Sequence, residues 1–407
     1  MDIAKLRLDR RMVVGGLIAA PLVAQSSMVA AQQPSGTPIR VGGTLPLTGP
    51  LASLGLVHKI AGEVFRDVIN AKGGLLGRPL ELVILDDQSQ PATTRTLYER
   101  LVTADKVDLL MGPYGTGAIL AAMGVAQRYN KLFIQSSLGD PALAPYDRQF
   151  PSLPLGPDPR TADTEILLDA YASAKTPPKS MAIVTSKFPS ALDLAKGGKE
   201  VAEKRGMTVP LFLEYEFGTK DFGAIASRVK DAAPDLLWMG SIGLEAGQLL
   251  DAMKRLEYVP ARHFYLFPAT GPTATNASAN GATSLTWFEE HAPFTEYTGS
   301  QDFAKLYNER AAAASLPWPR ADYQAAVEYA AWQILAEAVT ATKSLDDAVL
   351  TDWLKKGTVE TVVGTQTFTG KFNSGPVRTA VRQVQNGKWV AVWPLASRAP
   401  GTTLIAP

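Results

Sequence analysis

The sequence predicts an α/β protein made of two doubly wound lobes, and three observations lead to this prediction. Short apolar runs alternate with segments of helical periodicity, which is the pattern of parallel strands linked by helices. The alternation runs twice, and a proline-rich passage at 140–159 separates the two runs. Near the C-terminus, Asn386-Gly387 stands between two strand-like segments, a strong signal of a β-hairpin. A hairpin in this place suggests that the tail adds edge strands to an earlier sheet.

The first run begins with an expected strand at 39–45. An apolar face with helical spacing follows at 56–69 and ends at Gly73-Gly74, which predicts a helix. Pro91 is placed to open the next helix, because proline is favoured in the first helical turn. The remaining elements expected in this run are strands at 82–85, 107–111 and 132–134 and a helix at 118–129.

The second run repeats this order and predicts a second lobe. Strands are expected at 181–184, 211–217, 236–239 and 264–267, with helices at 166–171, 191–205, 222–230 and 244–256. Further helices are expected near 302–313, 323–340 and 345–355, and closing strands at 367–372, 380–385 and 389–393. Strands joined by right-handed helical crossovers form parallel sheets, so each run predicts one doubly wound lobe.

The N-terminus has the features of an export signal. Arg10-Arg11 precedes an uncharged stretch at 12–23, and Val29-Ala30-Ala31 offers the small residues that a signal peptidase accepts. We therefore expect residues 1–31 to be a cleaved signal peptide and the mature chain to be periplasmic. The paired arginines favour the twin-arginine route, but Asp9 departs from the usual signal, so the general export route stays open. The apolar stretch is shorter than the roughly 20 residues that span a bilayer, which disfavours a membrane anchor.

The composition excludes several classes of function. The 407 residues include 40 basic and 39 acidic side chains, so there is no basic surplus to bind nucleic acid. The chain has no cysteine, which rules out disulfides, zinc–thiolate sites and a cysteine nucleophile. Its three histidines share no helical spacing and it has no cofactor-binding loop, so we expect neither a metal nor a cofactor.

Two turns at the ends of expected strands are candidate ligand-binding segments. The first, Gly112-Pro-Tyr-Gly-Thr-Gly117, joins a strand to a helix and contains Tyr114 and Thr116. It lacks the lysine of a phosphate loop and the spacing of a dinucleotide fingerprint. Free N–H groups at the start of the helix, together with the Thr116 hydroxyl, would make a small anion site. Thr116 could instead merely cap the helix.

The second turn comes directly after the next expected strand. It contains Ser136, Ser137 and Gly139. Open α/β sheets bind ligands at the carboxyl ends of their strands, so two such turns on successive strands would converge on one crevice. An ordinary Ser/Gly turn is the alternative interpretation.

Two pairs of adjacent acids are weaker candidates. Asp86-Asp87 has no third ligand at a suitable spacing to hold a metal, which favours a turn at a strand end. Glu289-Glu290 could be a general acid and base, but adjacent strand residues point to opposite faces, so we expect a solvated edge. The sequence also lacks the G-x-S-x-G motif of serine hydrolases.

Several motifs occur in a distinctive order. They are Ile39-Arg-Val-Gly-Gly-Thr-Leu-Pro-Leu-Thr-Gly-Pro50, Val68-Ile-Asn-Ala-Lys-Gly-Gly74, Gly77-Arg-Pro-Leu-Glu-Leu82, Asp86-Asp87 with Pro91, Asp235-Leu-Leu-Trp-Met-Gly240 and Gln385-Asn-Gly-Lys-Trp-Val-Ala-Val-Trp-Pro394. In order and spacing the chain resembles the leucine/isoleucine/valine-binding protein family, the extracytoplasmic solute receptors of ABC importers. The resemblance implies a type I Venus-flytrap fold, two lobes joined by three crossovers, and no catalysis. It also implies a first lobe at 38–155 and 290–366 and a second lobe at 156–289 and 367–398.

The resemblance also implies where a ligand binds on the first lobe. In amino-acid-binding relatives, hydroxyls and N–H groups after the third and fourth strands hold the ligand carboxylate. These positions fall on Thr116, Ser137 and Gly139. The two candidate turns found from the residues alone are therefore the turns that the family uses.

The second lobe departs from the family pattern. Amino-acid receptors place an acid after a late strand, where it pairs with the ligand ammonium; here that position falls on Ala269. Two aromatic positions fall on Ser190, with Phe188 close by, and on Ile242. A buried ammonium without a partner is costly. A carboxylate without an α-amino group, aromatic or aliphatic, therefore fits at least as well as a branched-chain amino acid.

We expect a monomeric receptor that closes its two lobes over a small carboxylate-bearing solute and delivers it to ABC permease subunits. A sensory binding protein that docks on a signalling receptor is an alternative that the sequence leaves open. An exported α/β enzyme is a second alternative. The sequence disfavours it, because it lacks a nucleophile motif, a metal cluster and a cofactor loop.

Overall fold

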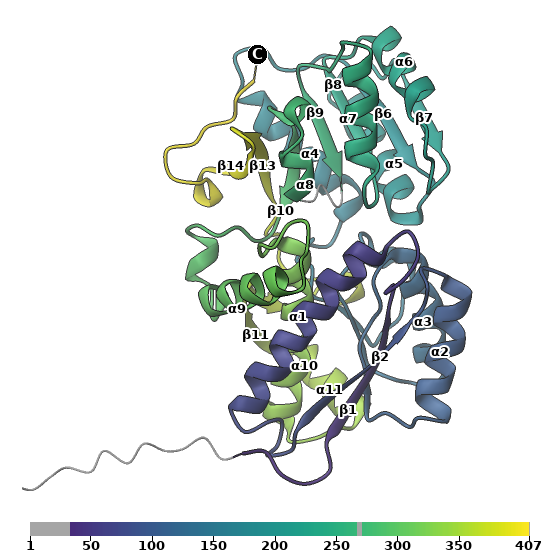
Figure 1. The fold of residues 1–407 in the computed structure, drawn as a ribbon, viewed down its shortest axis with the longest axis vertical. Helices are drawn as coiled ribbons and strands as arrows, with labels where there is room; N and C mark the ends of the chain where they lie inside the picture. The colour runs from purple at the N-terminus through teal and green to yellow at the C-terminus, as the bar shows by residue number, and fades with distance from the viewer. Residues whose placement is uncertain (1–32, 267–270, 407) are drawn as a thin grey trace, which may run out of the picture.

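The computed structural model describes residues 33–266 and 271–406. Two α/β lobes lie along the long axis of the molecule, and Figure 1 shows the chain passing between them. The predicted fold class is confirmed. The expected signal peptide at 1–31 and the candidate residue Ala269 lie outside the described residues.

The first lobe is organised around β1 (Ile39–Leu45), which pairs in parallel with β2 (Leu80–Asp86) and β3 (Leu109–Leu110). A bridge from Met111 to Ile134 connects this sheet to β4 (Phe133–Gln135), which pairs in parallel with β5 (Gln149–Pro151). The helices that follow β1, β2 and β3 are α1 (Ala52–Ala71), α2 (Pro91–Thr103) and α3 (Thr116–Arg128). Each helix thus begins near the carboxyl end of a strand, where the turns predicted to bind a ligand also lie.

The second lobe contains a seven-stranded sheet in the order β14-β13-β10-β9-β8-β6-β7. Its strands are β6 (Met181–Ser186), β7 (Phe212–Tyr215), β8 (Leu236–Gly240), β9 (His263–Leu266), β10 (Thr283–Thr286), β13 (Ala380–Gln385) and β14 (Lys388–Trp393). Its helices are α4 (Pro159–Ala172), α5 (Pro189–Lys204), α6 (Gly223–Ala232), α7 (Glu245–Arg255) and α8 (Gly271–Ala274).

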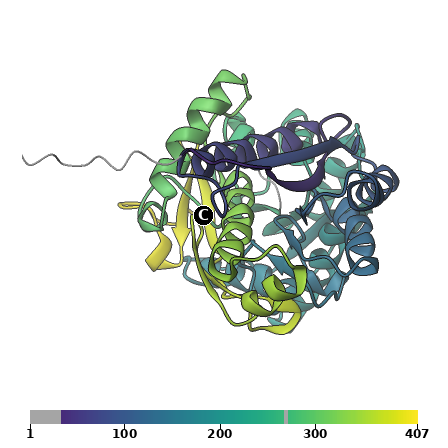
Figure 2. The same cartoon turned by 90° about the horizontal axis from the view of Figure 1, so that it is seen from below.

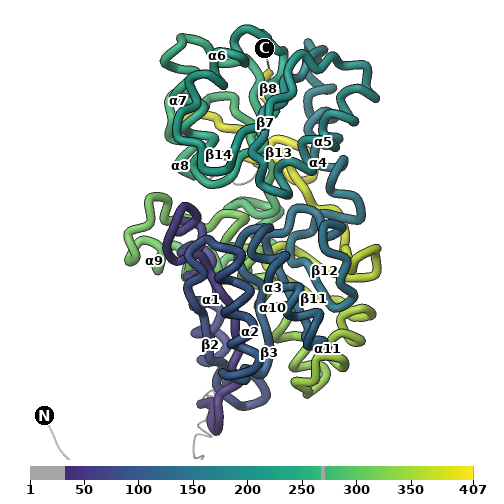
Figure 3. The backbone as a smooth tube through the Cα atoms, turned by 90° about the vertical axis from the view of Figure 1, so that its right-hand side faces the viewer, coloured from purple at the N-terminus to yellow at the C-terminus, as the bar shows by residue number. Residues whose placement is uncertain are grey.

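The predicted C-terminal hairpin is confirmed as β13 and β14, which add an antiparallel edge to this sheet. Figure 3 shows the two yellow strands inside the second lobe. Asn386 and Gly387 have φ of 53° and 73°. The turn needs this left-handed geometry, and Asn and Gly adopt it readily. Local turn chemistry therefore sets the pairing next to the turn, and an irregularity between Val381 and Arg382 shifts the register further along.

Between the two parts of the second lobe, the chain returns to the first lobe. It forms α9 (Ser300–Ala313), α10 (Tyr323–Thr342) and α11 (Asp347–Leu354), then the hairpin of β11 (Thr358–Thr361) and β12 (Gly364–Thr367). Helix α10 packs along α1, as the end-on view in Figure 2 shows. It is apolar on most sides, which suits a helix enclosed by the core.

One predicted strand is wrong. The segment 367–372 does not continue as a strand, because β12 ends at Thr367 and the short 3-10 turn Lys371–Asn373 follows. Phe372 and Asn373 have left-handed φ values of 57° and 56°, which an extended strand cannot contain. None of the helices in the described ranges is both long and apolar enough to cross a membrane.

Candidate functional site

Two helices, one from each lobe, point their N-termini at the same place. Helix α3 of the first lobe begins at Thr116, and α5 of the second lobe begins at Pro189. Thr116 Oγ1 donates a hydrogen bond of 2.7 Å to Ser190 Oγ, and both side chains are buried. Helix N-termini carry partial positive charge and free N–H groups. Their convergence therefore makes an environment that favours an anion between the lobes.

The local sequence explains why both helices begin here. Gly115 is the N-cap of α3 with φ of 91°, a conformation that favours glycine, and Pro189 is the first residue of α5. Gly115 N–H donates to Ser137 Oγ at 3.0 Å, which ties the two predicted turns together. The alternative that Thr116 caps the helix is wrong, because Gly115 is the N-cap and the Thr116 hydroxyl donates to Ser190 of the other lobe.

These turns surround a small cavity, which we call the anion cavity. It is lined by Tyr114, Gly115, Ser136, Ser137, Gly139, Leu153, Phe188, Ser190, Ile242 and Gln324. The structure thus brings together every described residue predicted for the site, with Thr116 bonded to its wall at Ser190. Its volume is about 20 Å³, which is room for about one water molecule. A solute carboxylate would have to separate Thr116 from Ser190 to enter.

Ser136 contributes to the wall, but its hydroxyl is committed elsewhere. Ser136 Oγ donates to Glu328 Oε2 of α10 at 2.7 Å. Glu328 Oε2 also lies 3.0 Å from His58 Nδ1, and Glu328 Oε1 accepts from Trp332 Nε1 at 2.8 Å. The proton of Ser136 therefore points at Glu328, and Ser137 is the better candidate for a hydroxyl donor to a solute.

The same buried network reaches Gln324, a lining residue that the sequence did not indicate. His58 Nε2 lies 3.1 Å from Gln324 Oε1, and the His58 ring packs 4.7 Å from the Tyr114 ring. Gln324 belongs to the first turn of α10, far along the chain from the predicted turns. Periodicity predicts that helix, but no local signal places its first turn in the cleft.

A second cavity, the middle chamber, also lies between the lobes and has a volume of about 150 Å³. Its walls come from α1, α9 and the 316–322 loop of the first lobe, and from residues next to α7 and in α8 of the second. They are Ser53, Leu54, Val57, Gly243, Leu244, Gly271, Pro272, Tyr307, Leu316, Pro317, Trp318, Arg320 and Asp322.

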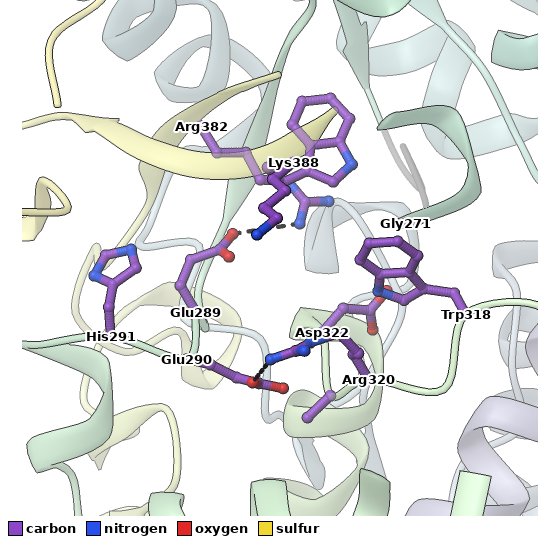
Figure 4. Close-up of a pocket in the computed structure, with 11 residues that line it drawn as sticks. Gly271, Glu289, Glu290, His291, Trp318, Arg320, Asp322, Arg382 and Lys388 are labelled. Atoms are coloured by element: carbon purple, nitrogen blue, oxygen red, sulfur yellow. Dashed lines mark hydrogen bonds and ion pairs between the residues drawn. The ribbon is translucent and has the colours of Figure 1, made fainter. Parts of the chain in front are cut away.

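A third cavity, the charged chamber, holds about 240 Å³ and is shown in Figure 4. Glu289 pairs with Arg382 at 3.3 Å, and Glu290 pairs with Arg320. Burial raises the pKa of Glu289, and the charge of Arg382 opposes that shift. The expectation that Glu289-Glu290 forms a solvated edge is therefore wrong, since both follow the end of β10 and meet arginines.

The charged chamber is the largest of the three, but Glu289 and Glu290 already pair with its two arginines. The anion cavity instead offers uncharged donors and two helix N-termini. Of the three cavities, the anion cavity therefore has the lining best suited to an uncompensated anion. In the described ranges, no group of three His, Cys, Asp or Glu side chains is arranged to hold a metal ion. Asp86-Asp87 forms the predicted turn, where Asp86 accepts from Leu47 N–H and Asp87 from Ser89 N–H.

Known proteins are similar to this chain over most of its length. Residues 38–388 match the family model described as periplasmic binding protein. A Leu/Ile/Val-binding protein of Rhizobium johnstonii is 26% identical over 342 residues, which cover 83% of this chain and 89% of that protein.

Two solved structures share the fold. A leucine-binding protein of Thermotoga maritima superposes with a TM-score of 0.76 at 17% identity, covering 89% of this chain and 99% of its own. A solute-binding protein of an ABC transporter from R. palustris, solved in complex with benzoate, has a TM-score of 0.74 at 19% identity, covering 91% and 99%. The family match, the curated relative and the shared fold agree, and the chain belongs to the periplasmic binding protein family.

Proposed function

We propose that this chain is the extracytoplasmic solute-binding component of an ABC importer and captures a small carboxylate-bearing solute between its lobes. The observation that carries the proposal is the hydrogen bond between Thr116 and Ser190, which joins two helix N-termini across the cleft. A carboxylate inserted there would receive charge-assisted hydrogen bonds from both lobes at once. Such a ligand favours the closed form because only the closed form offers both sets of donors.

The similar proteins support this class of solute. One is named as leucine-binding and another was solved with benzoate, and both of these solutes carry a carboxylate. We further propose that the mature protein works in the periplasm as a monomer and passes its solute to membrane permease subunits. Docking on a signalling receptor would use the same closed form. If permease genes neighbour the gene of this protein, their disruption should abolish solute uptake, as the transport role requires.

The solute can be found by a thermal-shift screen of amino acids, aromatic acids and short dicarboxylates, because a ligand of the native state raises its melting temperature. Calorimetry then measures the affinity of the solute found in the screen for the wild-type protein and for the Thr116→Val variant. Each lost charge-assisted bond is worth roughly 1.5–3 kcal/mol, so affinity should fall about tenfold to a hundredfold. Thr96→Val, at an exposed threonine of α2, is the matched control. Unchanged affinity in Thr116→Val would remove Thr116 from the site.

A further inference from the structure

Two aspartates, one from each lobe, face each other next to the anion cavity. Asp140 belongs to the first lobe and directly follows Gly139 of the cavity wall. Asp193 belongs to α5 of the second lobe, three residues after Ser190 and therefore on the same face of that helix. The carboxyl group of Asp193 lies within hydrogen-bonding reach of the carboxyl group of Asp140. A second contact between the lobes thus accompanies the bond from Thr116 to Ser190.

The two carboxyl groups cannot both be ionised without repelling each other. Asp140 is 6% exposed, and Oδ2 of Asp193 is buried with no hydrogen-bond partner in the described part of the chain. Burial and the carboxyl group of Asp193 raise the pKa of Asp140, although the hydrogen bond from the Ala142 N–H lowers it. Two carboxylates in such a site therefore hold a proton that either of them alone in water would release.

The groups around the pair do not relieve this repulsion. Asp158, the N-cap of α4, and the buried Asp163 of α4 oppose the ionisation of Asp140 with further negative charge. Arg160 lies 3.5 Å from Oδ1 of Asp193, but two hydrogen bonds of 2.6 Å commit its guanidinium to Glu200. In the described ranges, no group of three such acids is arranged to hold a metal ion. A proton is therefore the species that can neutralise the pair.

We infer that Asp140 and Asp193 form a proton-binding site between the lobes, so that closure of the lobes takes up a proton. With one shared proton, one carboxyl group donates a hydrogen bond to the other across the cleft. With no proton, two carboxylates repel each other and favour separation of the lobes. This inference rests on the closed form invoked in the proposed function, but it does not depend on which solute is bound.

Closure should therefore weaken as pH rises. In the open form the two acids are apart and meet solvent, so they bind protons less tightly than the closed pair does. The closed form is favoured at low pH, and this advantage is lost as pH rises through the higher pKa of the closed pair. For one proton, the ratio of closed to open protein falls by up to about tenfold per pH unit in that range.

Small-angle X-ray scattering of the solute-free mature protein at pH 5 and pH 8 tests this inference. We expect a larger radius of gyration at pH 8, because the doubly ionised pair drives the lobes apart. Asp140→Asn should abolish this difference, since its amide donates to Asp193 at either pH and its oxygen still accepts from the Ala142 N–H. Asp193→Asn should abolish it from the other lobe. Asp231→Asn, at an exposed position of α6, is the matched control and should keep the wild-type difference.

Thermal melts at both pH values establish that each variant is folded. An equal radius of gyration for the wild type at pH 5 and pH 8 would overturn the inference. A wild-type difference that persists in either folded variant, Asp140→Asn or Asp193→Asn, would overturn it as well. Neither result touches the proposed function, which fails separately if Thr116→Val leaves solute binding unchanged.

Discussion

Among single residues, Asp163 of α4 has the least satisfied side chain. It is 2% exposed, and neither carboxylate oxygen has a hydrogen-bond partner in the described part of the chain. Burial, together with the negative charge of Asp140, raises the pKa of Asp163 to about 8. The folded protein therefore holds a proton at this residue under conditions in which the unfolded chain releases it.

This difference makes stability depend on pH. Because the pKa of Asp163 in the folded protein lies above its ordinary value of 3.8, the contribution of Asp163 to stability is most favourable below pH 3.8. It is lost progressively as pH rises toward about 8. Asp163→Asn removes the ionisable group, so it should raise the melting temperature more at pH 8 than at pH 5. The expected gain at pH 8 is on the order of 1 kcal/mol or more.

The measurement is a set of thermal melts at pH 5, 6.5 and 8. Asp352→Asn, on the exposed face of α11, is the control and should leave the pH dependence unchanged. An Asp163→Asn protein that is less stable than the wild type at pH 8 would show that the carboxylate has a partner in solution.

At the scale of elements, the position of α5 depends on two glycines. A methyl group on Gly197 would lie 1.9 Å from the Arg160 carbonyl oxygen of α4, and one on Gly198 would lie 2.9 Å from Thr164 Oγ1. Only glycine lets the two helices approach this closely. Because the first turn of α5 carries Ser190, the packing of α4 on α5 also positions one side of the anion cavity.

Gly197→Ala should therefore push α5 away from α4. Overpacking of this kind costs roughly 1–3 kcal/mol of stability, and the displaced Ser190 should weaken solute affinity in the same variant. Gly124→Ala is the matched control, since nothing lies within 4 Å of a methyl group there and Gly124 is exposed in α3. That control should be neutral or slightly stabilising. Chemical denaturation measures the stability of both variants, and calorimetry measures their solute affinity. Normal affinity in Gly197→Ala would show that the α4–α5 contact does not position the site.

The elements and the site were predictable to different degrees. Strand–helix alternation predicted the parallel strands of both lobes, and Asn386-Gly387 predicted the closing hairpin, because these signals are local. The turns with Thr116 and Ser137 were predictable for the same reason. The roles of Glu328 and Gln324 were not, because the bond from Ser136 to Glu328 joins residues 192 positions apart. Nor did spacing reveal that Glu289 and Glu290 would meet Arg382 and Arg320, since chain folding brings those arginines to them.

At the scale of the whole molecule, the two lobes touch in this structure. Besides the Thr116–Ser190 bond, an apolar cluster across the cleft joins Leu51 and Leu54 of the first lobe to Ala191 and Ile242 of the second. We propose that the free protein exchanges between this closed arrangement and an open one that admits solute, and that solute shifts the balance to the closed form.

The distance between the lobes tests this account most directly. The chain has no cysteine, so spin labels can be placed uniquely by Arg95→Cys on α2 and Lys220→Cys before α6, both at exposed positions. Pulsed electron paramagnetic resonance then reports the distance distribution without solute and at saturation. We expect a broad distribution that becomes shorter and narrower when the solute found in the screen is added, and no such change in the Thr116→Val background at the same solute concentration. An identical distribution for free protein and for protein that calorimetry shows to be saturated would contradict capture by closure of the two lobes.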